Sequence, residues 1–220
     1  MVEKDFWLAS NSPRRREILG WLDWEIQTAP ANIDESRRAG ETARDYVMRV
    51  ACEKAAFPIP QVRDGSVVIA ADTIVVLGDE VLGKPRDAHD AFVMLAKLRG
   101  RTHQVLTAIA VSTAGHILQD LCYSPVIMRD YLDEEIEAYI ASGDPMDKAG
   151  AYAIQSSTFH PAAGFKGCFA SVMGMPLCHL ERTLKMCGII EPEQFGAVCQ
   201  NHLKYRCPIT DRVMAGEDIG

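Results

Sequence analysis

Several hallmarks of secreted, membrane-spanning and zinc-binding proteins are missing from this chain of 220 residues. It contains no C-x-x-C pair, and its seven cysteines are an odd number, which argues against a disulfide framework. No apolar run approaches the length of a membrane span. The first residues lack the basic region and apolar stretch of a signal peptide. We therefore expect a soluble, cytoplasmic protein with no membrane partner.

The chain also lacks the short motifs of several enzyme classes. Its six histidines form no H-x-x-x-H or H-E-x-x-H pattern, and no serine lies in a G-x-S-x-G context. Gly78–Lys84 has the spacing of a phosphate-binding P-loop, but Pro85 follows where a hydroxyl residue is required, which excludes that loop. Four residues could meet at one metal ion, although their spacing fits no common zinc module: Cys187, Cys199, His202 and Cys207.

Basic residues are outnumbered in this chain. Lys and Arg number 23 against 30 Asp and Glu, which gives a formal charge of -7. Sequence-independent nucleic-acid binding needs a broad basic surface, so we expect no nucleic-acid partner. The balance still allows a small polyanion to bind in a local basic pocket with the help of a divalent cation.

Strand-like and helix-like segments alternate along the chain. Residues 66–77 are apolar on both parities, as expected for a strand buried on both faces. The alternation predicts an α/β domain with a largely buried sheet, whereas residues 188–220 show little periodicity and form a tail of unknown role. We expect further strands over 6–9, 24–28, 103–111, 117–128 and 168–173, and helices over 13–22, 42–57, 87–98, 132–140 and 176–186.

The turn at Ser10–Pro13 predicts that a strand leads directly into a helix. Ser12 suits the N-cap and Pro13 the first helical position. A helix start presents unpaired N–H groups and a partial positive charge, and Ser10 and Arg14–Arg16 add hydroxyl and guanidinium groups. Two interpretations stay open from these residues: an anion site, or a capped helix with solvated arginines.

Asp72 is the most informative single residue. It interrupts an apolar stretch in which a bare carboxylate costs several kcal/mol unless it is paired or bound to a metal. A strand end, a structural ion pair and a functional carboxylate are the three options. A general base would benefit from such a partly desolvated position.

Other polar residues are less informative taken singly. Lys54 falls on the polar edge of a predicted helix, where lysines are usually solvated. Glu35, Lys148 and Gln155 fall in polar loops with the same expectation. Lys84 is a candidate for a single phosphate contact, because the Lys-Pro step holds it rigidly.

Taken in order, these segments resemble the Maf family of nucleoside triphosphate pyrophosphatases. The resemblance covers about residues 5–187 without obvious gaps. Ser171 and Met175 depart from the family pattern, which often has Asn and Leu there. The matching motifs are Leu8–Leu19, Asn32–Glu35, Glu53–Ala55, Ala71–Val75, Gly83–Pro85, His103–Thr107, Asp147–Gln155 and Gly174–Leu177.

The resemblance implies a fold and a reaction. The fold would be an elongated mixed sheet with flanking helices in two lobes around a central cleft, like that of inosine triphosphatases. The reaction would split a nucleoside triphosphate into monophosphate and pyrophosphate. Asp72 would activate water, and Glu35 and Asp72 would lie near a divalent metal, Mg²⁺ or Mn²⁺. The triphosphate would be bound by Ser10, Ser12, Arg14, Lys54 and Lys84.

Three positions indicate the branch of the family. Arg15, Thr73 and Gln155 are similar to the dTTP/UTP pyrophosphatases, whereas the branch preferring 7-methyl-GTP carries Trp, Gln and Glu. A Gln amide both donates and accepts, which suits a pyrimidine imide edge. Pyrimidine triphosphates and their modified analogues are therefore the expected substrates, and a homodimer is the expected assembly.

Two alternatives remain. A nucleotide-binding regulator of cell division or septum formation would keep the pocket without significant turnover. The loop Ser156–Lys166 beside Gln155 is either a plain surface loop, which we favour, or a lid whose rings Phe159, His160 and Phe165 stack on a base.

Overall fold

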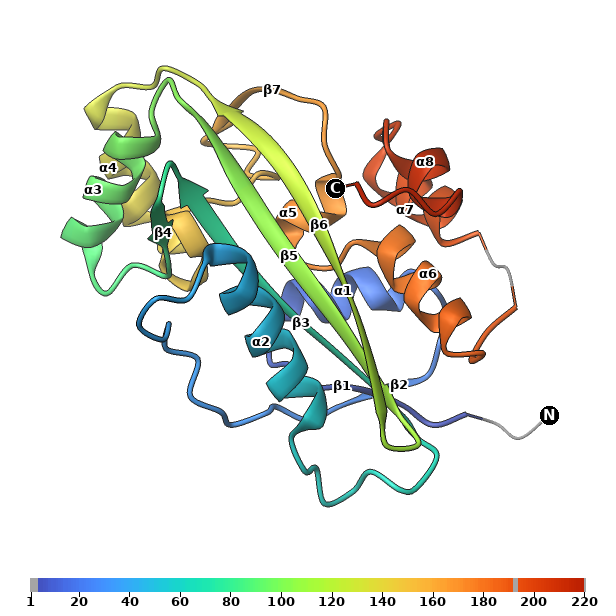
Figure 1. Cartoon of the computed structure of the whole chain (residues 1–220). Coiled ribbons are helices and arrows are strands. Elements are labelled where there is room, and N and C mark those ends of the chain that lie inside the picture. Colours follow the sequence, from blue (N-terminus) through green and yellow to red (C-terminus); the bar gives the residue numbers. More distant parts are fainter. Residues whose placement is uncertain (1–3, 192–193, 220) are drawn as a thin grey trace.

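The computed structural model describes residues 4–191 and 194–219. A single seven-stranded sheet in the order β2-β1-β3-β5-β6-β7 forms its centre, with β4 paired to β3 (Figure 1). Pairing is parallel at β2-β1-β3 and antiparallel elsewhere. The strands are β1 (Phe6–Leu8), β2 (Ile26–Thr28), β3 (Val67–Leu77), β4 (Glu80–Leu82), β5 (Thr102–Thr113), β6 (His116–Met128) and β7 (Ala162–Phe165).

Helices flank both faces of this sheet. Figure 1 shows α2 lying across one face of the long strands β3, β5 and β6, with α1 and α6 on the opposite face. The mixed sheet with flanking helices that the sequence predicts is therefore confirmed. The helices are α1 (Pro13–Gly20), α2 (Ala43–Ala56), α3 (Ala88–Leu98), α4 (Asp133–Ala141), α5 (Phe169–Met173), α6 (Leu177–Met186), α7 (Phe195–Leu203) and α8 (Thr210–Met214), with 3₁₀ turns η1 (Asp144–Asp147) and η2 (Ala149–Ala151).

Alternation along β3 divides the core into two clusters. Ile69 and Ala71 face the larger cluster, which also contains buried residues of α1, α3, α4, α6, α7 and α8. Val68 and Ala70 face the smaller cluster under α2. Because successive side chains of a strand point to opposite faces, the apolar residues of β3 are divided between the two clusters.

The segment 168–173 is a helix, not the strand that the sequence predicts. Residues Phe169–Met173 form α5, and Gly174 ends the helix in the left-handed region at φ 106°. The N–H of Met175 reaches back to the carbonyl of Ala170 at 2.9 Å, a hydrogen bond that closes the helix end. A short apolar run has the same pattern whether it is a buried strand or a buried helix, which explains the error.

The C-terminal tail is packed into the main core. Phe195 of α7 is 1% exposed and meets Trp24 edge to face, with ring centroids 5.1 Å apart. Val213 of α8 is fully buried in the same cluster. Arg182 of α6 donates to the carbonyl of Val213 in α8 and to that of Glu217 just after it. The weak periodicity of residues 188–220 in the sequence thus conceals two helices.

No helix within residues 4–191 and 194–219 is both long and apolar enough to cross a bilayer.

Candidate active site

A break in the pairing of β3 opens the candidate site. One edge of the strand pairs with β5 along most of its length, over Val68–Val76. The other edge pairs with β1 only at Val67–Ile69 and with β4 only at Val75–Leu77. Asp72 and Thr73 lie between those two pairings, on the wall of a cavity of about 590 Å³.

The structure gathers all the predicted site residues around this one cavity. They come from the loop after β1, from α1, from the loop before α2, from α2 itself, from β3 and from the segments after β4 and η2. Their chemical roles stay predictions. The lining includes Ser10, Ser12, Arg14, Arg15, Glu35, Lys54, Asp72, Thr73, Lys84 and Gln155.

Asp72 and Thr73 point to opposite faces of the sheet. Asp72 has the parity of the residues under α2, and Thr73 has the parity of the larger cluster. The cavity therefore wraps around the edge of β3 and has two chemically different walls. We call the wall of Glu35, Lys54 and Asp72 the carboxylate side, and that of Arg15 and Thr73 the hydroxyl side. The buried Thr107 supports the hydroxyl side by a hydrogen bond between its Oγ1 and Thr73 Oγ1, at 3.1 Å.

On the carboxylate side, one buried ammonium joins two carboxylates. Lys54 Nζ donates to Asp72 Oδ1 and to Glu35 Oε2, both at 2.8 Å. The side chains of Lys54 and Asp72 are 8% and 10% exposed, so this contact is shielded from water. Lys54 is not on a solvated edge of α2 as its helical position indicates, because the helix lies against β3 at this point.

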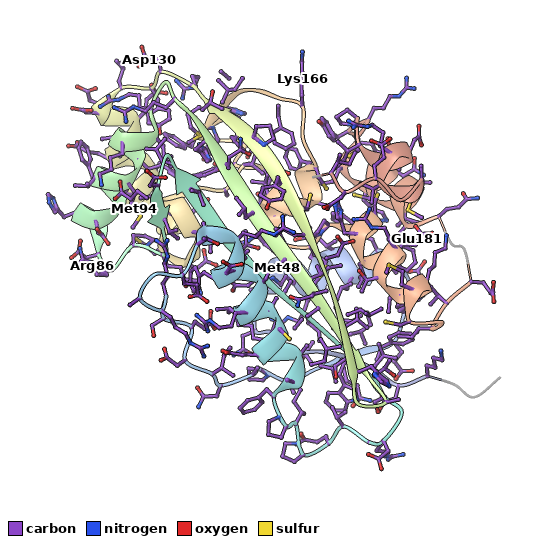
Figure 2. All side chains as sticks on the ribbon, in the orientation of Figure 1. Met48, Arg86, Met94, Asp130, Lys166 and Glu181 are labelled. Atoms are coloured by element: carbon purple, nitrogen blue, oxygen red, sulfur yellow. The ribbon has the colours of Figure 1, made fainter. Side chains whose placement is uncertain are left out.

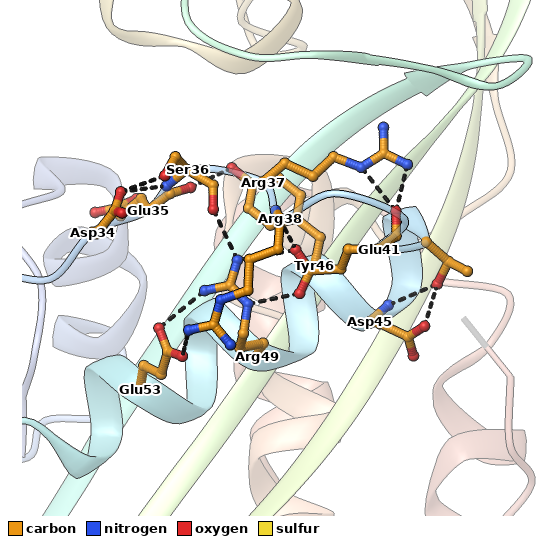
Figure 3. A network of polar contacts seen from close by, with 11 residues as sticks. Asp34, Glu35, Ser36, Arg37, Arg38, Glu41, Asp45, Tyr46, Arg49 and Glu53 are labelled. Atoms are coloured by element: carbon orange, nitrogen blue, oxygen red, sulfur yellow. Dashed lines mark hydrogen bonds and ion pairs between the residues drawn. The ribbon is translucent and has the colours of Figure 1, made fainter.

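A polar network fixes the loop that carries Glu35 (Figure 3). Tyr46 Oη of α2 donates to the carbonyl of Glu35 at 2.7 Å. Arg49, one turn further, donates to the carbonyl of Ser36 at 2.9 Å and to Glu41 Oε1 at 2.6 Å. Helix α2 therefore supplies Lys54 and also the groups that hold Glu35 beside it. The sequence reasoning missed Tyr46 and Arg49, because apolar periodicity alone drew attention to this helix.

The hydroxyl side is a chain of neutral acceptors around one guanidinium. Arg15 donates to Thr73 Oγ1 and Ser10 Oγ at 3.3 Å each, and to the carbonyl of Gly174 at 3.0 Å. Thr107 donates to the carbonyl of Ser171 at 2.7 Å. Burial lowers the pKa of Arg15, against the opposing influence of the Asp72 charge.

The start of α1 forms the rim between the two walls. Ser12 caps the helix by accepting from the N–H of Arg15 at 3.5 Å, and Pro13 follows as the first helical residue. Ser10 Oγ accepts from the N–H of Ser12 at 3.1 Å, which keeps its own proton for another acceptor. The start of α1, with its partial positive charge, thus lines the cavity, which favours anion binding.

The opposite rim contains charged residues for which the sequence predicts no particular role. Lys148, 7% exposed, donates to Asp147 Oδ1 at 2.7 Å and to Asp144 Oδ1 at 2.9 Å. Asp147 also accepts from Arg14 at 3.3 Å, which joins η1 to α1 across the cavity. The motif Asp147–Gln155 marks this segment in the sequence as part of the family pattern. The segment reads as a polar loop, however, so the sequence does not indicate that Lys148 is buried.

The loop 156–166 does not offer its rings to the cavity. Phe159 is 4% exposed and stacks on Tyr139 at a centroid distance of 4.3 Å. Phe165 lies in β7 and meets Phe169 edge to face at 5.7 Å. Figure 2 shows Lys166 pointing outward from the molecule. The base-stacking interpretation of Phe159 and Phe165 is therefore wrong, since both rings pack within the protein.

The four C-terminal residues considered as metal ligands are not assembled for that purpose. His202 instead stacks on Trp21 with ring centroids 5.0 Å apart. In the described part of the chain, no group of three or more His, Cys, Asp or Glu side chains could by itself hold a metal ion. That excludes a zinc module built from Cys187, Cys199, His202 and Cys207.

Comparison with known proteins identifies the family. A profile of the Maf-like protein family matches residues 5–187, so the chain belongs to that family and the resemblance seen in its motifs is confirmed. A dTTP/UTP pyrophosphatase of Shigella dysenteriae serotype 1 is 46% identical over 171 residues, which cover 78% of this chain and 87% of that protein. The dTTP/UTP pyrophosphatase of Anaeromyxobacter dehalogenans is 47% identical over 190 residues, which cover 84% and 95%.

Among solved structures, a HAM1 protein from Coxiella burnetii aligns over 91% of this chain and 96% of that chain, with a TM-score of 0.42 and 13% identity. This likeness is too slight to support any conclusion about the fold.

Proposed function

We propose that this chain hydrolyses nucleoside triphosphates, namely dTTP, UTP and modified pyrimidine analogues, to the monophosphate and pyrophosphate. The names of its relatives support the substrate class. The observation that carries the proposal is the place of Asp72. It is a carboxylate only 7% exposed, at the unpaired edge of a central strand, on the wall of a cavity that lysines and arginines line.

Asp72 would accept the proton of the attacking water. Its Oδ1 is engaged by Lys54, so the proton would pass to Oδ2. Lys54 holds the carboxylate in one orientation, and Glu35 shares the ammonium from the other side. A base fixed in this way is ready before the nucleotide arrives, and positioning of the reactants lowers the barrier of a phosphoryl transfer.

The triphosphate would lie along the rim formed by the start of α1. The hydroxyls of Ser10 and Ser12 would donate to phosphate oxygens without adding charge, beside the partial positive charge of the helix start. Arg14, Lys54 and Lys84 would supply the positive charge that the leaving pyrophosphate needs. Because these cations are local to the cavity, the formal charge of -7 on the whole chain is no obstacle.

Glu35 and Asp72 fit a divalent cation. Their oxygens already converge on one cationic atom, Lys54 Nζ, at 2.8 Å each. Mg²⁺ is usually held by one or two carboxylates together with substrate phosphates, and a pair of carboxylates matches that donor set. When bound, Mg²⁺ or Mn²⁺ would neutralise charge on the phosphates. We expect the cation to bind together with the nucleotide, since two carboxylates alone are a weak site.

The base would be read at the hydroxyl side. Arg15 and Thr73 contact each other, and Gln155 lines the same cavity from the segment after η2. The Gln155 side chain both donates and accepts, which matches the alternating groups of a pyrimidine imide edge. From the family resemblance we also propose a cytoplasmic location and a homodimer, which light scattering would show as about twice the chain mass of 24.3 kDa.

Pyrophosphate release from dTTP with Mg²⁺ or Mn²⁺ tests the proposal. We expect the wild type to turn over and Asp72→Asn to lose activity by about 10²–10⁴-fold, the usual contribution of a general base. Asp79→Asn, at an exposed turn position after the same strand, should keep full activity. Nucleotide binding by the wild type without pyrophosphate release would overturn the hydrolase and support a regulator.

A further inference from the structure

Five of the cysteines gather where the tail meets the rest of the molecule. Cys168 interacts with both Cys122 and Cys207, and Cys178 Sγ donates to Thr210 Oγ1 of the tail at 3.7 Å. All are free thiols. We call this group the thiol cluster; the body contributes Cys122, Cys168 and Cys178, and the tail contributes Cys199 and Cys207.

Contacts on both sides hold Cys168 and Cys207 opposite each other. Tyr205 Oη donates to the carbonyl of Gly167 at 3.0 Å, and its ring lies 5.8 Å from that of Phe169. These contacts bind the two segments that carry the cysteines. The N–H of Cys207 also donates to Gln200 Oε1 at 3.0 Å, which fixes the loop after α7. Tyr205 thus places the segment that carries Cys207 against both chain neighbours of Cys168, and the Cys168 thiol interacts with that of Cys207.

The members of the thiol cluster differ in access and reactivity. Cys207 is half-buried, whereas Cys168 is 3% and Cys122 0% exposed. The Cys168 thiol lowers the pKa of Cys207 to about 6, which favours the reactive thiolate form. Burial raises the pKa of Cys178 and Cys199 to about 12, which keeps both as unreactive thiols.

We propose that Cys207 and Cys168 are a reversible oxidation site, at which a peroxide joins them in a disulfide that ties the tail to the body. Cys207 is the accessible sulfur, and Cys168 is the thiol held beside it. Nothing in the proposed hydrolysis uses either residue, so this inference stands apart from that function.

The chemistry needs hydrogen peroxide or an organic peroxide as the oxidant. The Cys207 thiolate attacks one peroxide oxygen, the O–O bond breaks, and a sulfenic acid forms with release of hydroxide, which takes up a proton. The Cys168 sulfur then attacks the sulfenic sulfur, the S–O bond breaks, and water leaves. Two thiols and one hydrogen peroxide thus give one disulfide and two waters, and a dithiol reductant reverses the step.

The tie would act close to the cavity. Cys168 is the N-cap of α5, and the carbonyls at the other end of that helix hold the hydroxyl side. Ser171 accepts from Thr107 there, and Gly174 accepts from Arg15. Oxidation would therefore fix the segment that supports base recognition.

A thiol count on the intact chain tests the proposal. After stoichiometric hydrogen peroxide and removal of the excess, we expect alkylation in denaturant to find five thiols in place of seven, and peptide mapping to find a Cys168–Cys207 link. Cys207→Ser should keep all six of its thiols, whereas Cys168→Ser should lose only the Cys207 thiol, as a sulfenic or sulfinic acid, and should form no link. Cys52→Ser, in α2 and outside the thiol cluster, should fall from six to four. Seven remaining thiols, sulfinic acid without a link, or a link between other cysteines would overturn the site.

Thermal unfolding gives a second readout that does not depend on a variant of Cys168. A disulfide that closes a loop of this length should raise the Tm of the oxidised wild type by roughly 5–10 °C. Dithiothreitol should reverse the shift, and Cys207→Ser should show none. A link formed without any change in Tm would contradict a tie between tail and body.

Discussion

The two walls of the cavity are built from neighbouring residues of one strand, yet they follow opposite rules. The carboxylate side places three charged groups in direct contact, with Lys54 8% exposed between Glu35 and Asp72. The hydroxyl side places a guanidinium among neutral oxygens, those of Thr73, Ser10 and Gly174. The carboxylate side therefore groups three charges together, whereas the hydroxyl side surrounds one charge with neutral hydrogen-bond acceptors.

This difference indicates how one strand can place the proposed hydrolysis on one of its faces and the proposed recognition of the base on the other. Under the proposed function, a proton acceptor and a divalent cation need opposite charges close together, which the carboxylate side would supply. A nucleobase edge is uncharged and is best distinguished by directed hydrogen bonds in a fixed geometry, which the hydroxyl side would supply. Because Asp72 and Thr73 point to opposite faces, each wall can be altered without direct loss of contacts in the other.

Removal of the ammonium should damage the carboxylate side most. Lys54→Met leaves Asp72 buried without its partner, and we expect the free energy of unfolding to fall by about 3–5 kcal/mol. The double variant with Asp72→Asn should recover most of that loss, because no bare carboxylate then remains. Lys97→Met, which breaks an exposed pair with Glu80, should cost less than about 1 kcal/mol in urea unfolding. Equal losses for both lysines would show that the carboxylate side is not shielded.

Low pH should reduce the free energy of unfolding through His103, which lies near the hydroxyl side. This residue is 2% exposed beside Tyr152 of the cavity wall, and burial lowers its pKa from 6.5 to about 4. Below pH 6.5 the unfolded chain takes up a proton that the folded chain refuses, so stability falls as the pH drops towards 4.

The loss should reach about 3 kcal/mol at pH 4 relative to pH 7, because burial lowers the pKa of His103 from 6.5 to about 4. Urea unfolding at a series of pH values measures it. His103→Gln should lack this component, whereas His116→Gln at an exposed position should keep it. An identical pH dependence of wild type and His103→Gln would refute the assignment.

Arg49 should act on the carboxylate side from a distance. Arg49→Lys cannot reach both Ser36 and Glu41, so the loop that carries Glu35 loses its clamp. We expect the Mn²⁺ concentration for half-maximal activity to rise about tenfold, as for other residues that orient metal ligands, while kcat at saturating Mn²⁺ stays within about twofold. Arg38→Lys, whose partner contact is exposed, should leave both values unchanged. A fall in kcat alone would contradict a positioning role.

Gln155→Glu should have the smallest effect and should be confined to recognition. Glutamate only accepts hydrogen bonds, so it loses a donor to the pyrimidine edge, and we expect kcat/KM for dTTP and UTP to fall about tenfold, or about 1.4 kcal/mol. Metal dependence should not change. Gln119→Glu, which adds the same charge at an exposed position of β6, is the matched control. Unchanged kinetics would place base recognition elsewhere.

Much of the fold was predictable because its long elements have clear periods. The buried character of residues 66–77 and the capped start of α1 were both visible in the sequence. Segment 168–173 was not, because five apolar residues match two kinds of structure and tertiary packing decides between them. The tail helices escaped notice because their apolar positions only form a face once Trp24 and α6 are beside them.

The candidate site was predictable as a set of residues but not as a set of contacts. Motifs marked Asp72 and Lys54 separately, yet their hydrogen bond joins a strand and a helix, and only the packing of α2 on β3 creates it. The contacts of Lys148 could not be predicted either. Its loop has no periodicity, so nothing in the sequence indicates that two aspartates and a backbone carbonyl enclose its ammonium.

The burial of the last two helices has a consequence for synthesis. Residues of α7 and α8 complete the same apolar cluster that β3, β5 and α1 begin. A nascent chain on the ribosome would therefore expose part of that cluster until α7 and α8 leave the exit tunnel, although every residue of the cavity wall has by then emerged. A ribosome that stalls before α7 emerges would hold a chain whose cavity residues are all present but whose apolar cluster is still open.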